Sequence, residues 1–219
     1  MLECRMLNKG EIFLSYPEID MFKYENELLN KGYKYIVGTD EAGRGPMAGP
    51  LVVAAVILPV DKKIDGLNDS KKLSSKQREI LFDDIIKNAI EYSIEFIDVE
   101  DVDNLNVYQA SKIGMINCIK KLKAPVDYIL SDAIPLGIDI PCMDIIKGDA
   151  QSSSIAAASI LAKVSRDRYM CEIASKYPKY GFEKHKGYVT KHHLEMLELH
   201  GPCEIHRRSF EPVRKSLYR

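Results

Sequence analysis

The apolar run Leu51-Val-Val-Ala-Ala-Val-Ile-Leu58, with a proline at each end, places the strongest limit on how this chain can fold. Its β-branched residues favour a β-strand, and the flanking Pro50 and Pro59 mark where that strand begins and ends. The run has eight residues, whereas a membrane-spanning helix needs roughly 20, so an integral membrane protein is not expected. Of the 219 residues, 46% are hydrophobic and 29% are charged, which is typical of a soluble globular protein.

The rest of the chain alternates between strand and helix patterns. Further strands are predicted over residues 34–40, 91–98, 126–132 and 142–147. Helices are predicted over residues 20–31, 74–88, 106–122, 152–176 and 190–200. A short turn between the first two strands favours antiparallel pairing, and helices between the later strands favour parallel pairing. The predicted fold class is α/β, with a mixed sheet flanked by helices.

Charge is unevenly distributed along the chain. Residues 163–219 hold 13 Lys and Arg against 7 Asp and Glu, together with all five His, although the whole chain has a net charge of −1. A basic region of this kind can bind polyanions such as nucleic acids. Chance asymmetry explains the charge distribution equally well, so charge alone does not decide the function.

The cysteines and the N-terminus bear on the cellular compartment. The five cysteines are odd in number and form no C-x-x-C pair, which favours reduced thiols over a disulfide framework. Residues 1–10 contain no basic cluster followed by an apolar stretch, so a secretory signal is not expected. These features predict a cytoplasmic protein.

The segment Gly38-Thr-Asp-Glu-Ala-Gly-Arg-Gly-Pro-Met-Ala-Gly49 carries two adjacent acids at the end of a predicted strand. Neighbouring strand residues point to opposite faces, so we expect the chain to leave regular strand geometry for Asp40 and Glu41 to serve one site. Residues 43–48 also match the dinucleotide fingerprint G-x-G-x-x-A, which requires a helix to follow. Residues 51–58 are typical of a strand, and a dinucleotide-dependent oxidoreductase is therefore only an alternative.

Two further acids lie at comparable positions. Asp132 ends another apolar strand, and Asp149 directly precedes the long predicted helix. If the strands that end in Asp40 and Asp132 are neighbours, these acids converge at one edge of the sheet. Grouped carboxylates repel one another, and divalent cations with oxygen ligands, such as Mg²⁺ or Mn²⁺, remove that penalty. Two such ions are the arrangement used for in-line attack on phosphodiesters.

Six segments occur in an order and spacing that together are specific for one enzyme family. They are Asp-Glu-Ala-Gly-Arg-Gly (40–45), Asn-Asp-Ser-Lys-Lys-Leu (68–73), Lys-Gly-Asp (147–149) with the helix segment 155–168, Tyr-Pro (177–178), His-Lys-Gly-Tyr (185–188) and His-Arg-Arg-Ser-Phe-Glu-Pro (206–212). The chain resembles bacterial ribonuclease HII, the type 2 ribonuclease H, over residues 34–213. It departs from that family at Ser-Asp-Ala (131–133), where the family usually has Val-Asp-Gly.

The resemblance implies a ribonuclease H-like fold and a metal-dependent endoribonuclease. Such an enzyme cleaves the RNA strand of RNA–DNA hybrids and incises 5′ of single ribonucleotides in duplex DNA, leaving 3′-hydroxyl and 5′-phosphate ends. The resemblance also implies two ions, Mg²⁺ or Mn²⁺, held by catalytic acids at Asp40, Glu41, Asp132 and Asp149. The expected domains are an N-terminal helical extension (1–33), the catalytic core (34–170) and a C-terminal helical substrate-binding region (171–219), which forms one compact unit with the core.

The same resemblance implies a set of substrate contacts. The turn Gly43-Arg44-Gly45 is expected to sense the 2′-hydroxyl that distinguishes RNA from DNA, and Tyr177 to pack on the sugar that follows the junction. Phosphate contacts are expected from Lys71 and from the basic C-terminal region. The basic residues predicted there are Lys163, Arg166, Lys184 and Lys186. A catalytically silent hybrid-binding protein is a second alternative.

Two other clusters are interpreted as structural. The acidic residues within 98–103 lack the spacing of a calcium loop and favour a helix-dipole role. The His and Cys residues within 192–206 lack a zinc-ligand pattern. A monomer is expected, and the sequence leaves open the role of residues 1–33 and whether a replication clamp binds.

Overall fold

A five-stranded mixed sheet forms the centre of the molecule. The computed structural model describes residues 4–6, 12–14, 20–59, 64–67, 70 and 73–218. In spatial order the strands are β5 (Glu91–Ile97), β4 (Leu51–Ile57), β3 (Ile36–Ala42), β6 (Tyr128–Asp132) and β7 (Cys142–Ile145). The pairs β5–β4 and β4–β3 are antiparallel, whereas β3–β6 and β6–β7 are parallel. The predicted mixed α/β sheet is confirmed.

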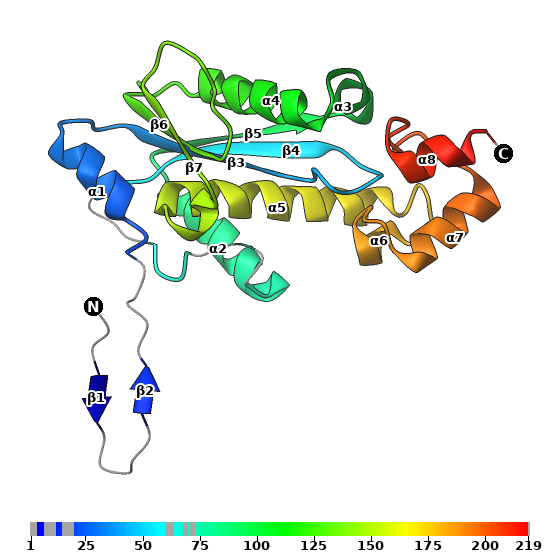
Figure 1. Ribbon diagram of the computed structural model, residues 1–219, viewed down its shortest axis with the longest axis horizontal. Helices are drawn as coiled ribbons and strands as arrows, with labels where there is room; N and C mark the ends of the chain where they lie inside the picture. The colour runs from blue at the N-terminus through cyan, green and yellow to red at the C-terminus, as the bar shows by residue number, and fades with distance from the viewer. Residues whose placement is uncertain are drawn as a thin grey trace.

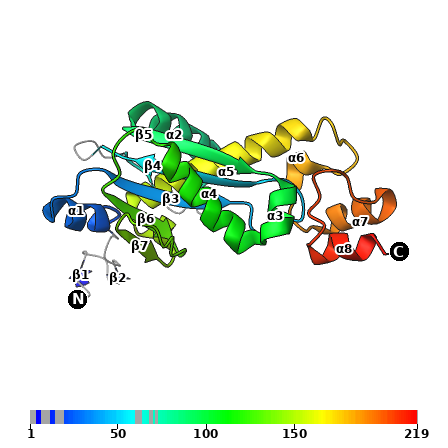
Figure 2. The same cartoon turned by 90° about the horizontal axis from the view of Figure 1, so that it is seen from above.

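Helices cover both faces of this sheet (Figure 1). Helices α2 (Ser75–Asn88) and α5 (Ser153–Ile173) pack on one face, and α4 (Val107–Lys121) packs on the other, beside α3 (Val99–Leu105). Figure 2 shows α5 running on beyond the sheet toward the C-terminal helices. These helices are α6 (Phe182–His185), α7 (Lys191–His200) and α8 (Glu211–Ser216).

Strand β4 is buried on both faces, as its uniformly apolar sequence requires. Val52, Ala54 and Val56 pack against α2 and α5, and the alternate residues pack against α4. All seven residues of the strand have a relative exposure of 0%. Full burial of one valine side chain contributes roughly 1.5–3 kcal/mol, so β4 anchors the two cores to each other.

Helix α5 approaches β3 very closely at Gly38. A Cβ atom at Gly38 would lie less than 3.0 Å from backbone atoms of Ser154 and Ile155. Small residues at 156–158, in the first turns of α5, are fully buried against the sheet. This contact sets the start of α5 beside the strand that carries Asp40 and Glu41.

Most predicted elements are confirmed with shifts of a few residues at their ends. The capping box at Ser74 is present, with reciprocal hydrogen bonds between Ser74 and Gln77. The helix predicted over 106–122 is preceded by a separate helix, α3, because Asn106 adopts a φ of +66° and caps α4 with its side chain. The short helices α6 and α8 were not predicted.

One expectation about how the strands are connected and one about residues 1–33 are wrong. β4 and β5 are joined through α2 but pair antiparallel, because the connection returns to the end of the sheet where it began: Ile90 N donates to Ile57 O. Residues 1–33 are not helical throughout, since β1 (Cys4–Met6) and β2 (Ile12–Leu14) pair as an antiparallel hairpin. β-prone residues such as Ile12 and Phe13 favour a strand there. Within the described part of residues 1–33, the helix is α1 (Lys23–Asn30). The predicted domain boundaries stay predictions.

No helix in the described part of the chain is long and apolar enough to cross a membrane.

Candidate active site

Three of the predicted acids line one cavity at the end of two neighbouring strands. Asp40 and Glu41 come from β3, and Asp132 is the last residue of β6. The cavity they line has a volume of about 280 Å³. Pairing between β3 and β6 ends at Thr39 and Ser131, so the two strands separate just before their acids, and the cavity lies where they part.

The expected departure from strand geometry at these acids is wrong. β3 continues through Ala42, and both Asp40 and Glu41 stay paired with β4. Both acids nevertheless line the cavity.

Burial and the neighbouring carboxylates raise the proton affinity of Asp40. Asp40 is only 4% exposed, and burial, followed by the negative charges of Glu41 and Asp132, raises its pKa well above the ordinary value. Asp40 Oδ1 accepts a hydrogen bond from Glu41 N at 2.7 Å, which offsets part of that penalty. A buried group of oxygen ligands with mutual repulsion fits a hard divalent cation.

Asp149 lies in a turn that is hydrogen-bonded to Asp132. It lies in the 3₁₀ turn η1 (Gly148–Ala150) and is 3% exposed. Gly148 N donates to Asp132 Oδ1 at 2.7 Å, which joins the end of β6 to that turn. Among the residues that the structure describes, no three His, Cys, Asp or Glu side chains are grouped so that they could hold a metal ion. The Asp149 side chain does not line the cavity.

The residue after Asp132, Ala133, has a backbone conformation that favours glycine. Its φ is +53°, in the left-handed region where glycine carries no penalty. A non-glycine residue there costs on the order of 1–3 kcal/mol. The strain lies in the backbone next to Asp132.

Glycine occurs at two positions of the turn after β3 for different physical reasons. Gly43 has a φ of +107°, and a Cβ there would lie less than 3.0 Å from the Arg166 side chain and from Pro50 O, so the fold requires glycine. A Cβ at Gly45 would meet only Tyr188 Cε1, at 3.7 Å. Gly45 is exposed and lines the cavity, so its lack of a side chain leaves room for a ligand. The turn leads into β4 and not into a helix, which contradicts the dinucleotide alternative.

Arg166 does not take the predicted role of a direct phosphate contact. Its side chain is fully buried, and it donates to Pro50 O, Lys186 O and Ala48 O at 2.9–3.0 Å. Burial lowers its pKa to about 10, so it stays charged at neutral pH. Because its guanidinium donates to these carbonyl oxygens, Arg166 stabilises the backbone that follows the glycine turn.

Arg207 supports the same turn and was missed by sequence reasoning. It is also fully buried, and it donates to Gly49 O at 3.0 Å and to Arg44 O at 3.4 Å. Burial and the nearby charge of Arg166 lower its pKa to about 9. Its place in the His-Arg-Arg segment was the only signal for it in the sequence.

Some of the remaining predicted substrate contacts line the cavity and others do not. Lys163 lines it and pairs with Asp167 at 2.7 Å, and Arg44 pairs with Glu41 at 3.3 Å. Lys184 and Lys186 belong to the C-terminal region and do not line it. Lys71 lies outside the described residues.

Two tyrosines differ from expectation. Tyr177 does not line the cavity; it is half-buried after the end of α5, and its hydroxyl donates to Glu204 at 2.6 Å. Tyr188 does line the cavity and is 43% exposed. The sequence contained a signal for Tyr188, because it closes the His-Lys-Gly-Tyr segment. Two serines that line the cavity were also missed, Ser70 and Ser159, whose hydroxyl groups lie 2.8 Å apart.

A chain of neutral imidazoles stabilises the C-terminal region that carries Tyr188. His193 Nδ1 donates to Tyr188 O at 2.9 Å, and its Nε2 accepts from His206 Nε2 at 3.1 Å. His206 Nδ1 in turn accepts from Cys203 N at 3.0 Å. Burial lowers the pKa of His193 to about 3 and that of His206 to about 4, so both rings are neutral at pH 7.

Acidification should therefore destabilise the protein through these rings. The unfolded chain takes up these protons at about pH 6.5, whereas the folded chain resists them down to about pH 4 and below. The free energy of unfolding should fall below about pH 6.5, by up to about 1.4 kcal/mol per pH unit for each ring. Denaturant unfolding at pH 7, 6 and 5 measures this slope. His193→Gln should flatten it and the exposed His192→Gln should not; equal slopes in all three proteins would contradict the prediction.

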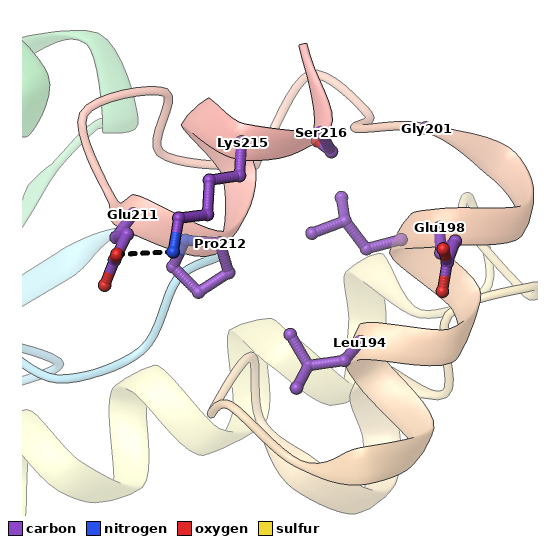
Figure 3. Close-up of a pocket in the computed structure, with 8 residues that line it drawn as sticks. Leu194, Glu198, Gly201, Glu211, Pro212, Lys215 and Ser216 are labelled. Carbon is purple, nitrogen blue, oxygen red and sulfur yellow. Dashed lines mark ion pairs between the residues drawn. The ribbon is translucent and has the colours of Figure 1, made fainter. Parts of the chain in front are cut away.

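A second pocket lies between α7 and α8 and shares no residue with the acid cavity (Figure 3). Its volume is about 360 Å³, and an ion pair between Lys215 and Glu211 lies at one side. Leu194, Leu197 and Pro212 form its apolar part. None of the predicted site residues contributes to it.

Comparisons with known proteins show which family this chain belongs to. The family model described as Ribonuclease HII matches residues 37–213. Ribonuclease HII of Bacillus mycoides (strain KBAB4) is 54% identical over 196 residues, which are 90% of this chain and 76% of that protein. Ribonuclease HII of Bacillus cereus (strain Q1) is 53% identical over the same length and shares of each chain.

Solved structures show the same fold. The crystal structure of ribonuclease H2 from Pyrococcus horikoshii OT3 superposes with a TM-score of 0.70 at 28% identity, covering 83% of this chain and 96% of that one. The structure of the PCNA:RNase HII complex from Archaeoglobus fulgidus superposes with a TM-score of 0.67 at 27% identity, covering 81% and 95%.

Proposed function

This chain belongs to the ribonuclease HII family, and on that premise we propose that it cleaves RNA in RNA–DNA hybrids and incises 5′ of single ribonucleotides embedded in duplex DNA. Family membership makes it a ribonuclease H, a hydrolytic endonuclease, and its dependence on divalent metal is part of the proposal. The observation that carries the proposal is the meeting of Asp40, Glu41 and Asp132 in one cavity, with the Gly43–Gly45 turn in its wall.

The four acids are the proposed metal ligands. Asp40, Glu41 and Asp132 face the cavity, and Asp149 joins them through the turn held by the Asp132–Gly148 hydrogen bond. When bound, two Mg²⁺ or Mn²⁺ ions supply positive charge at the attacking water and at the leaving 3′ oxygen. Lys163, which lines the same cavity, is placed to bind the phosphate at the scissile bond. The proposed products carry a 3′-hydroxyl and a 5′-phosphate.

Selectivity for RNA is proposed to depend on the backbone of the Gly43–Gly45 turn. A backbone donor or acceptor recognises a 2′-hydroxyl without reading the base. Within this turn, the buried guanidinium of Arg207 donates to Arg44 O, and Arg207 and Arg166 also donate to Gly49 O and Pro50 O, which follow the turn. A rigid turn recognises the ribose with little loss of conformational entropy.

Gly45→Ala separates this role from folding. The added methyl group meets nothing closer than 3.7 Å within the protein, so the free energy of unfolding should change by less than about 0.5 kcal/mol. Cleavage of a hybrid should fall roughly 10- to 100-fold, because a displacement of the bound substrate by about 1 Å has a cost of that size. Steady-state kinetics and denaturant unfolding measure the two effects. Unchanged kinetics in a stable Gly45→Ala protein would exclude this position from substrate recognition.

Tyr177 is proposed to pack its ring on the sugar that follows the RNA-to-DNA junction. Glu204 and Lys176 hold it at the surface through a hydrogen bond to its hydroxyl and a contact over its ring. Tyr177→Ala should lower the rate by roughly 10-fold or more, since a base or sugar stacked on an aromatic ring contributes about 1–3 kcal/mol. Tyr177→Phe, which keeps the ring, should retain most activity. Equal rates for the Ala variant and the unaltered protein on a junction substrate would remove Tyr177 from the site.

Neighbouring surfaces suggest further interactions. Lys184 and Lys186 are proposed to bind phosphates independently of sequence, so substrate affinity should decrease as salt rises. A monomeric, cytoplasmic enzyme is part of the proposal. The Archaeoglobus relative is described in a complex with PCNA, and a sliding clamp is therefore a partner to test.

One assay tests the proposed function directly. A labelled DNA duplex that contains one ribonucleotide is incubated with the protein and Mg²⁺, Mn²⁺ or a chelator. We expect a nick on the 5′ side of the ribonucleotide with either metal and none with the chelator. Retention of the duplex without a nick at every metal concentration would instead support the silent hybrid-binding alternative.

A further inference from the structure

Helix α1 binds the segment that directly follows Asp149, although α1 lies outside the residues matched by the family model. The match begins at residue 37, whereas α1 spans Lys23–Asn30. Figure 1 shows α1 at the end of the sheet where α5 begins. The contacts between them connect this N-terminal helix to the active site.

Glu25 is the centre of these contacts. It is 7% exposed, and its Oε1 accepts hydrogen bonds from Ser152 Oγ at 2.6 Å, Ser154 Oγ at 2.6 Å and Ser154 N at 2.9 Å. Because Ser152 is the N-cap of the 21-residue helix α5, the carboxylate also lies at the positive end of a long helix. A buried carboxylate held in this way is fixed in position.

Backbone contacts from the same region complete the attachment. Met21 O accepts from Ser153 N at 2.7 Å and from Ser153 Oγ at 2.9 Å. Tyr24 contributes a longer hydrogen bond from its hydroxyl to Gln151 at 3.5 Å. Every residue from 151 to 154 is therefore hydrogen-bonded to the segment that contains α1.

Asp149 lies between two fixed points. On one side, Gly148 N is bound to Asp132 Oδ1, and on the other, Ser152 N donates to Gly148 O at 2.8 Å. The turn between them is short, and Lys147 enters it with a φ of +56°. Displacing residues 152–154 would therefore displace the Asp149 carboxylate.

We propose that Glu25 is a positioning residue for Asp149, and that α1 is needed for full metal binding at the active site. The inference rests on the proposed role of Asp149 as a metal ligand. Glu25 does not touch the metal or the substrate. It sets the first turn of α5 and, through that turn, the place of Asp149 relative to Asp132.

Three variants of the full chain test this proposal. Glu25→Ala removes the acceptor. Glu25→Gln keeps the Oε1 acceptor and puts an amide nitrogen in the place of Oε2, which is buried and has no hydrogen-bond partner among the described residues. Glu27→Ala is the matched control, because Glu27 is an exposed glutamate of the same helix. Mn²⁺ binding is measured by titration calorimetry without substrate, and hybrid cleavage is measured against Mg²⁺ concentration.

Glu25→Ala should weaken Mn²⁺ binding and raise the half-saturating Mg²⁺ concentration by roughly 10-fold or more, as loss of a residue that orients a metal ligand does. The KM for the hybrid should not change, and excess Mg²⁺ should restore part of kcat. Glu25→Gln should lie between Glu25→Ala and the unaltered protein, and Glu27→Ala should match the unaltered protein. Combining Glu25→Ala with Asp149→Asn should weaken Mn²⁺ binding no further than Asp149→Asn alone.

A purely structural role for Glu25 gives a different result. In that case Glu25→Ala would lower the melting temperature but leave Mn²⁺ binding and the Mg²⁺ dependence unchanged, which would overturn the proposal. If Glu25→Ala does not fold, Ser154→Ala removes one donor to the same carboxylate and must give the same metal phenotype in weaker form. Failure of the unaltered protein to bind Mn²⁺ and to nick would overturn the proposed function itself, whereas failure confined to the variants would overturn only this inference.

Discussion

Asp40→Asn should reduce hybrid cleavage by roughly 10³-fold or more, because a catalytic metal supplies several kcal/mol of transition-state stabilisation. The asparagine has the same size and keeps an oxygen that can accept the hydrogen bond from Glu41 N. It lacks the charge that a shared metal ligand needs. Asp40 is buried in the wall of the cavity that Glu41 and Asp132 also line.

The same substitution should stabilise the metal-free protein. Burial and the charges of Glu41 and Asp132 oppose ionisation of Asp40, and a neutral side chain removes that repulsion. The free energy of unfolding without metal should rise by about 1 kcal/mol, a gain of the kind seen when a strained functional site is neutralised. Added Mg²⁺ should then stabilise Asp40→Asn less than the unaltered protein.

Kinetics and thermal unfolding, each with and without Mg²⁺, measure these effects. Asp144→Asn is the control, since Asp144 is an exposed aspartate on strand β7 of the same sheet, and it should alter neither activity nor stability. Retention of more than about a tenth of the activity in Asp40→Asn would remove Asp40 from its central position, because that loss corresponds to only about 1.4 kcal/mol.

Gly38→Ala should lower the free energy of unfolding far more than Gly45→Ala does. The new Cβ would lie less than 3.0 Å from backbone atoms of Ser154 and Ile155, and backbone cannot rotate away as a side chain can. β3 is hydrogen-bonded on both sides, to β4 and β6, so α5 has to move. We expect the free energy of unfolding to fall by about 3 kcal/mol or more, the upper end of the cost of overpacking.

Gly38→Ala should also lose activity, because it separates the start of α5 and Asp149 from the strand that carries Asp40. Denaturant unfolding and cleavage assays on the same preparations measure both effects. Gly45→Ala is the matched control, with the opposite pattern of preserved stability and impaired cleavage. A stable Gly38→Ala protein with normal activity would show that α5 does not need this close approach.

Sequence patterns predicted much of the fold because the signals are local. The run 51–58 became β4, the capping box at Ser74 began α2, and the apolar segment ending in Asp132 became β6. The ordered motifs also identified the family, since they preserve residue types at fixed spacing. Hydrophobic periodicity and capping are properties of neighbouring residues, and they can be read without knowing the tertiary contacts.

Which of these residues meet was decided by long-range packing. Asp132 joins Asp40 and Glu41 in one cavity because β6 lies beside β3 in the sheet, and no local pattern encodes which strands become neighbours. Arg166 looks like a surface cation in the sequence, but its burial beneath the turn makes it a support. Glu25 is one of several glutamates near the N-terminus, and only the docking of α1 on α5 distinguishes it. Strand register, burial and helix docking join residues more than a hundred positions apart, and they follow from how the whole core packs.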